Sequence, residues 1–140
     1  MAGVRTPPAV GSVIGPMSVT TPLTRLVRWA GASGDFTPIH FDRDYAKGPA
    51  ALPDIIVHGP LKMALCIRLL TEWAGGDPAA VRRIALRYGS MDVVDSTIEI
   101  AATVTAVDES QHSVDVELSL RVDGRESTTG TATIRYGVSG

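Results

Sequence analysis

An alternation of apolar and polar residues between Val114 and Asp123 constrains the fold of this chain more than any other feature. Successive side chains of a β-strand point to opposite faces of the sheet, so strict alternation predicts a strand with one buried face and one solvated face. The apolar set is Val114, Val116, Leu118, Leu120 and Val122, and the polar set is Asp115, Glu117, Ser119, Arg121 and Asp123.

Similar alternation recurs at 84–88, at 98–106 and, more weakly, at 132–136. Turn-forming residues separate these runs at 108–110 and at 123–124, where Asp-Gly is a strong signal for a two-residue hairpin. The second half of the chain is therefore predicted to form an antiparallel sheet.

A largely apolar helix is predicted before this sheet, from about Pro60 to Ala74. Apolar residues cover most of its circumference, which is typical of a buried helix. Its strongly polar positions are Lys62, Arg68, Thr71 and Glu72, and the pair Arg68 and Glu72 can interact on an exposed strip because they are four residues apart. A buried helix before a one-sided sheet predicts an α+β fold with the sheet wrapped around the helix.

A shorter amphipathic helix is predicted near the beginning of the chain. Thr21 is its expected N-cap and Pro22 its first residue, and the apolar positions continue to Ala30. Gly31 and Gly34 are expected to end it, because glycine readily adopts the left-handed conformation that closes helices.

Length and composition limit the number of domains, the kinds of partner and the location. The 140 residues suit one domain, 1–140, with no repeat or linker. The net charge of -2 argues against nucleic acid or an acidic membrane as a partner. The chain has one cysteine, no apparent signal peptide and no apolar run approaching about 20 residues, so a cytoplasmic location is expected.

The segment Gly34-Asp35-Phe36-Thr37-Pro38-Ile39-His40 holds the residues best suited to chemistry. Pro38 restricts the loop that joins Asp35 to His40. An imidazole exchanges protons near neutral pH, and a carboxylate can orient a water and stabilise the charged imidazole. This pair would suit the addition of water to, or its removal from, a carbon–carbon double bond conjugated to a thioester.

Such a reaction also needs a donor for the thioester oxygen, which gains negative charge. Pro60 suits the first position of the long helix, so the backbone N–H of Gly59 is expected at the positive end of the helix dipole. Gly59 is therefore the candidate for an oxyanion hole, a kind of donor often worth about 3 kcal/mol.

Three segments of the chain resemble the MaoC-like (R)-specific hydratases and dehydratases: AGASGDFTPIHFDRDYAK, DIIVHGPLKMAL and the run from LLTEWAGG to TVTAVD. The usual loop pattern of that family is Gly-Asp-x-Asn-Pro-hydrophobic-His, and this chain departs from it at Thr37. The resemblance implies a single hot-dog domain with Asp35 and His40 as the catalytic pair and Gly59 as the oxyanion-hole amide. It implies thioesters of coenzyme A or acyl carrier protein as substrates.

Other polar residues have ordinary structural interpretations. His58 is expected to be hydrogen-bonded packing and Cys66 a small buried hydrophobe, whereas His112 is expected to be solvated. The arginines at 82, 83 and 87 are interpreted as a solvated strand face, although they could meet the phosphates of coenzyme A or an acidic carrier protein. The three histidines lack metal-ligand spacing, and Asp42-Arg43-Asp44 lacks the rest of a calcium loop, so no metal or other cofactor is expected.

Three functions stay open at this stage. The first is reversible hydration of enoyl and (3R)-hydroxyacyl thioesters, by a chain that pairs as a homodimer or with another hot-dog subunit. The second is a subunit of a heterodimer that acts on fatty-acyl or steroid side-chain thioesters, since EWAGGDPAAVRRIALRYG resembles subunits of both kinds and hot-dog acyl pockets can lie between two chains. The third, which GDFTPIH disfavours, is a hot-dog thioesterase.

Overall fold

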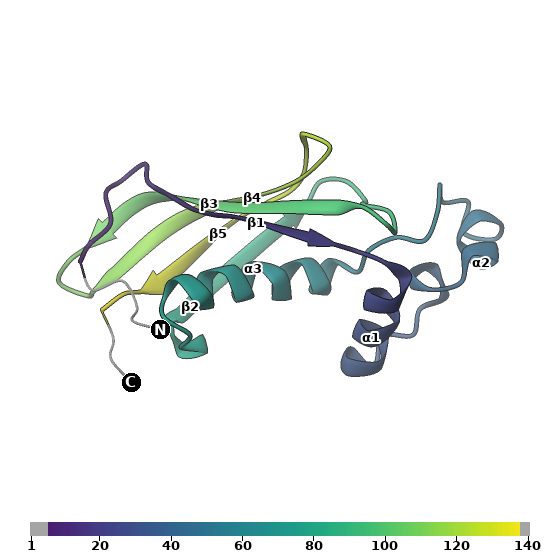
Figure 1. Ribbon diagram of the computed structural model, residues 1–140, viewed down its shortest axis with the longest axis horizontal. Helices are drawn as coiled ribbons and strands as arrows, with labels where there is room; N and C mark the ends of the chain where they lie inside the picture. The colour runs from purple at the N-terminus through teal and green to yellow at the C-terminus, as the bar shows by residue number, and fades with distance from the viewer. Residues whose placement is uncertain (1–5, 138–140) are drawn as a thin grey trace.

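The fold is a five-stranded antiparallel sheet with a long helix along one face (Figure 1). The computed structural model describes residues 6–137. The strands are β1 (Val13–Thr20), β2 (Val81–Tyr88), β3 (Thr97–Asp108), β4 (Ser113–Val122) and β5 (Arg125–Arg135), and their order in the sheet is β1-β3-β4-β5-β2. The predicted antiparallel sheet is confirmed.

The helix α3 (Gly59–Trp73) agrees with the predicted helix to within one residue at each end. Its buried side chains pack on the apolar face of the sheet and form the centre of the core. Arg68 and Glu72 make the predicted exposed pair, with 2.8 Å between Nε and Oε1. In contrast, Lys62 is 2% exposed, which is rare for lysine.

The predicted alternation in β4 is confirmed, because its even-numbered residues are buried from Val114 to Val122. The turn to β5 places Asp123 and Gly124 at φ 51° and 75°, as a two-residue hairpin with both central residues at positive φ requires. In β3 the predicted alternation fails at Ala106, which is exposed because the register with β4 shifts after Val104.

The sequence patterns did not predict β1, which pairs with β3 at the edge of the sheet. Gly15 and Pro16 interrupt its pattern, and the register shifts between Ile14 and Met17. A Cβ on Gly15 would lie 2.9 Å from the carbonyl oxygen of Ile100, so only glycine fits there. Proline has no N–H to donate to a ladder and is tolerated in such an edge strand.

The first helix, α1 (Leu23–Ser33), begins later and ends later than predicted. Thr21 is not its N-cap, because the hydroxyl of Thr21 donates to the carbonyl of Ser96 (3.1 Å). Gly31 lies inside the helix, whereas Gly34 ends it at φ 75° as predicted. The N-cap prediction for Thr21 fails because its hydroxyl is already bonded to Ser96. This bond ties the end of β1 to the segment before β3.

Three short helices complete the described chain: η1 (Pro38–His40), α2 (Arg43–Lys47) and η2 (Pro78–Ala80). Figure 1 shows α1 and α2 together near the end of α3 where that helix begins. The loop that contains Asp35 and His40 joins α1 to η1, so it lies at this end of the molecule. Among residues 6–137, no helix combines the length and apolar character that a membrane crossing needs.

Candidate active site

The loop after α1 brings Asp35 and His40 together, with 3.9 Å between Oδ2 of Asp35 and Nε2 of His40. Gly34 reverses the chain at the end of α1, and its N–H donates to the carbonyl of Ala30 (2.9 Å). Pro38 then begins η1, whose last residue is His40. The imidazole is buried and the carboxylate half-buried, so one side of this pair remains open.

The Asp35 carboxylate is held by Thr37. Its Oδ1 accepts from the backbone N–H of Thr37 (3.1 Å) and from the hydroxyl of Thr37 (2.6 Å). These bonds, the hydroxyl first, lower the pKa of Asp35 below its ordinary value. Thr37 thus fixes the loop where the resemblance leads one to expect asparagine, and the carboxylate is ionised at neutral pH.

His40 is oriented by the backbone between η1 and α3. Its Nδ1 lies 2.7 Å from the carbonyl oxygen of Ile56. A carbonyl can only accept, so Nδ1 carries the proton, and Nε2 of the neutral ring keeps a lone pair that can accept one. Two acceptors 3.9 Å apart form a suitable place for a water that donates one O–H to each.

A second imidazole lies behind the first. The ring of His58 stacks on that of His40, with centroids 3.8 Å apart and planes 20° from parallel. His58 is fully buried, and neither of its ring nitrogens has a hydrogen-bond partner among the described residues. His58 is therefore buried packing, as predicted, but without the predicted hydrogen bond. Burial, and then the neighbouring His40, lower the pKa of His58, so it stays neutral.

Asp35, His40 and His58 each offer one possible metal-ligand atom, and these atoms lie within 4.8 Å of one another. A shared ion must lie close to the plane of each imidazole, at about 2.0–2.1 Å from its nitrogen. Rings stacked face to face direct their lone pairs along nearly parallel planes. The cluster is therefore better suited to proton transfer than to holding a metal.

Gly59 lies beside this cluster as the first residue of α3. Its N–H makes no hydrogen bond within the described part of the chain, as expected for the first turn of a helix. A cavity of about 540 Å³ brings His40 and Gly59 to a common wall. Ile56, Val57, Lys62, Tyr88, Gly89, Ser90 and Met91 complete its lining. The structure thus gathers all three predicted site residues around one end of α3.

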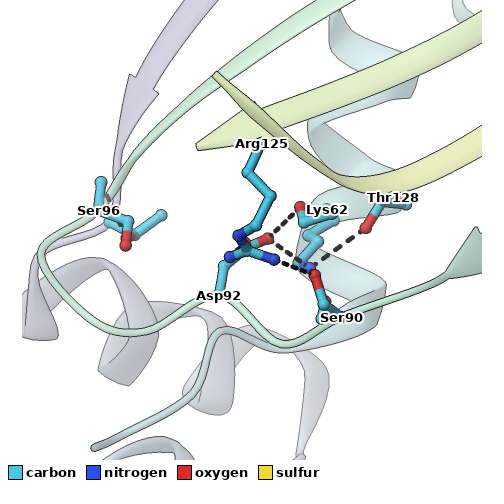
Figure 2. Close-up of polar contacts among 8 residues, drawn as sticks. Lys62, Ser90, Asp92, Ser96, Arg125 and Thr128 are labelled. Carbon is cyan, nitrogen blue, oxygen red and sulfur yellow. Dashed lines mark hydrogen bonds and ion pairs between the residues drawn. The ribbon is translucent and has the colours of Figure 1, made fainter. Parts of the chain in front are cut away.

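The cavity also contains residues that the sequence patterns did not single out as part of a site. Figure 2 shows Lys62 directed towards Asp92, and their Nζ and Oδ2 lie 2.6 Å apart. Thr128 and Ser90 provide further acceptors for Lys62. The one sequence feature that could have indicated this pair is a lysine in an otherwise apolar helix. Its partner could not be predicted, because Asp92 lies 30 positions away in an irregular segment.

The remaining predictions for single residues agree with the structure. Cys66 is fully buried, and burial raises the pKa of its thiol to about 12, so it is a poor nucleophile. His112 is exposed in the turn before β4. The arginines of β2 are exposed as a strand face, and none of them lines the cavity beside His40.

The arrangement of the sheet and α3 defines a class of protein, the hot-dog fold, which solved hydratase structures share. The (R)-hydratase from A. caviae has the same architecture, with a TM-score of 0.84, 24% identity and coverage of 92% of this chain and 97% of that one. The predicted hot-dog fold is confirmed. The family model described as "MaoC like domain" matches residues 8–125, and this chain belongs to that family.

Two relatives are described as parts of larger assemblies. The 3-oxo-4,17-pregnadiene-20-carboxyl-CoA hydratase beta subunit of Mycobacterium tuberculosis is 33% identical over 107 residues, covering 76% of this chain and 81% of the relative. The ChsH1-ChsH2 complex from Mycobacterium tuberculosis matches with a TM-score of 0.81 and 27% identity over 91% of this chain and 98% of that one.

A protein described as a MaoC-like dehydratase has a TM-score of 0.86 and 29% identity over 96% of this chain. The match covers 43% of that protein, so this chain spans less than half of its length.

Proposed function

We propose that this protein reversibly hydrates enoyl thioesters to (3R)-hydroxyacyl thioesters. The observation that carries the proposal is the placement of His40 Nε2, 3.9 Å from the Asp35 carboxylate, in a cavity that Gly59 also lines. A proton acceptor, a group that orients water and a backbone donor are the three components that the reaction needs.

In the hydration direction, a water held between Asp35 and His40 attacks the β-carbon of the conjugated thioester. His40 Nε2 accepts a proton as the new C–O bond forms, and the electron pair of the double bond moves towards the thioester oxygen. The Asp35 carboxylate accepts the second hydrogen bond of the water and stabilises the imidazolium. The proton on His40 then passes to the α-carbon, which balances the reaction and restores the neutral imidazole.

Gly59 supports this step through its backbone. The N–H groups at the start of a helix point out of it, and the helix dipole stabilises negative charge at that end. The thioester oxygen carries most charge midway through the reaction, so a donor there stabilises the transition state more than the substrate. The absent side chain of Gly59 also lets the thioester approach the backbone closely.

The second candidate is a subunit of a heteromeric hydratase. It is favoured by the similarity to a hydratase beta subunit and to the ChsH1-ChsH2 complex. In that arrangement this chain contributes Asp35, His40 and Gly59, and a second hot-dog chain contributes part of the acyl-binding wall. Coenzyme A and acyl carrier protein are the two carriers that we propose for the substrate.

The reaction class is tested by giving the purified protein a short enoyl-CoA and following two signals at once. Loss of the ultraviolet absorbance of the conjugated double bond, without release of free thiol, supports hydration. Release of thiol with the double bond intact identifies a thioesterase and overturns the proposal. Activity that appears only after co-expression with a second hot-dog chain supports the heteromer, and inactivity in every combination rejects both candidates.

A further inference from the structure

The sheet ends in two edge strands, β1 and β2, and β2 has the more regular edge. β1 is interrupted by Gly15 and Pro16, where its register with β3 shifts. β2 contains no proline, and its pairing with β5 runs without a shift from Arg83 to Tyr88. The other edge of β2 pairs with no strand among residues 6–137. A regular free edge is a template on which a strand of another chain can pair.

The face of β2 towards α3 is apolar and only partly covered. Ile84 and Leu86 pack against the core but remain half-buried. Tyr88 follows on the same face, 46% exposed, and its ring lies beside Gly59 at the start of α3. Directly opposite residues of an antiparallel pair share a face, with Cβ atoms about 4.5–5.5 Å apart. A partner residue opposite Tyr88 would therefore lie beside the cavity that His40 and Gly59 line.

The outer face of β2 carries positive charge and no carboxylate. Arg83 and Arg87 are exposed there on either side of Ala85, and Arg82 is exposed at the register shift before them. None of these three arginines forms an ion pair with any residue that the structure describes. The free edge is thus bordered by cations without partners.

These charges oppose the pairing of β2 with β2 of a second copy. Pairing centred on Ala85, for example, would put Arg83 directly opposite Arg87 of the other copy. Every other antiparallel register that keeps the outer faces together places Arg83 or Arg87 opposite, or diagonally next to, the same residue of the second copy. Like charges in these positions destabilise a sheet, and β2 has no acidic residue to relieve them.

We propose that the free edge of β2 binds a different hot-dog chain, whose edge strand carries carboxylates. Aspartate or glutamate opposite Arg83 and Arg87 would form exposed ion pairs across the two strands, and such pairs select a partner more than they strengthen the complex. The inward side chains of the same strand would cover Ile84 and Leu86. This inference names the partner of the heteromeric candidate above, and to that extent it rests on the proposed function.

The test supplies the acidic edge with a variant of this chain, Arg83→Glu/Arg87→Glu. Wild type and variant should each sediment as monomers at low micromolar concentration, because like charges meet in both self-pairings. An equimolar mixture should form a one-to-one complex, and its affinity should fall at least about tenfold as salt is raised from about 0.05 M to about 0.5 M. In the complex, amide hydrogen exchange should slow in β2 and remain unchanged in β1.

A charge reversal elsewhere provides the matched control. Arg25→Glu/Arg28→Glu makes the same change of net charge on α1, which follows β1 at the opposite edge of the sheet, and its mixture with wild type should stay monomeric. A stable dimer of wild type alone would overturn the inference. A monomeric mixture of wild type with Arg83→Glu/Arg87→Glu would also overturn it, and the arginines would then protect the edge or meet an acidic carrier protein.

Hydration of a short enoyl-CoA, measured on the same samples, separates this inference from the proposed function. If the complex forms and neither it nor wild type hydrates the substrate, the result counts against the proposed function and the β2 interface stands. If wild type hydrates the substrate and never pairs with the acidic variant, the proposed function stands and the inference about β2 fails.

Discussion

The imidazole of His40 lies face to face with that of His58, at 3.8 Å between ring centroids. Only His40 has a hydrogen bond to orient it, from Nδ1 to the carbonyl of Ile56. His58 therefore supports the flat side of the His40 ring while the Ile56 carbonyl fixes its rotation. Together they aim Nε2 at Asp35.

This stacking predicts how acid affects stability. The pKa of His58 is lowered in the folded protein, so the unfolded chain binds a proton on His58 more readily as pH falls below about 6.5. The unfolded state then binds more protons than the native state, and the free energy of unfolding decreases. His58→Phe keeps a stacked ring but cannot bind the proton, so its stability should fall less between pH 7 and pH 5.

Urea unfolding at several pH values measures the effect, with the exposed His112→Asn as a control expected to behave like wild type. Parallel pH dependence of wild type and His58→Phe would contradict the account of His58.

Thr37 should set the acid limit of activity. Its hydroxyl is the largest cause of the lowered pKa of Asp35, so Thr37→Val is expected to raise that pKa. The ionised carboxylate is the active form, and it would then be lost at a higher pH than in wild type. The acidic limb of the kcat profile should move upward in Thr37→Val and remain in place in Thr37→Ser. An unchanged limb in the valine variant would exclude this role.

Much of the fold was predictable because its patterns are local. The alternation in β4, the Asp123-Gly124 turn and the apolar α3 each follow from residues adjacent in sequence. By contrast, Gly15 and Pro16 conceal β1, whose pairing depends on contact with β3. The shift after Val104 is likewise set by the neighbouring strand.

The candidate site likewise contains residues that local motifs predict and contacts that they do not. Asp35, His40 and Gly59 stand in recognisable motifs. The structure places His40 and Gly59 in the lining of one cavity and Asp35 3.9 Å from His40. The Lys62–Asp92 pair joins residues that are distant in sequence and has no periodic signal. The stacking of His58 on His40 could not be predicted either, because it depends on how η1 meets the start of α3.

Gly59 should tolerate alanine structurally but not catalytically. An added Cβ would lie 3.1–3.3 Å from ring atoms of Tyr88, whose half-exposed side chain can move aside. Alanine favours helix, so thermal stability should not fall. The added methyl group would enter the proposed thioester site, and we expect kcat/KM for a short enoyl-CoA to fall about tenfold, a loss near 1.4 kcal/mol. Unchanged kcat/KM would place the thioester elsewhere.

The buried pair of Lys62 and Asp92 predicts strongly non-additive stability. Lys62→Met leaves the buried carboxylate of Asp92 with Arg125, half-exposed and 3.8 Å away, as its remaining cation, so a loss of about 3 kcal/mol is expected. Neutralising both residues, as in Lys62→Met/Asp92→Asn, should recover most of that loss. A double-mutant cycle by urea unfolding checks this, and additive losses would contradict a coupled pair.

The central claim is that Asp35 and His40 jointly add water to an enoyl thioester. Its most direct measurement is kcat for hydration of a short enoyl-CoA by wild type, Asp35→Asn and His40→Ala, with thermal unfolding to show that each variant is folded. The account predicts that each substitution lowers kcat by about 10³-fold or more. Folded variants that hydrate the substrate at the wild-type rate would contradict it.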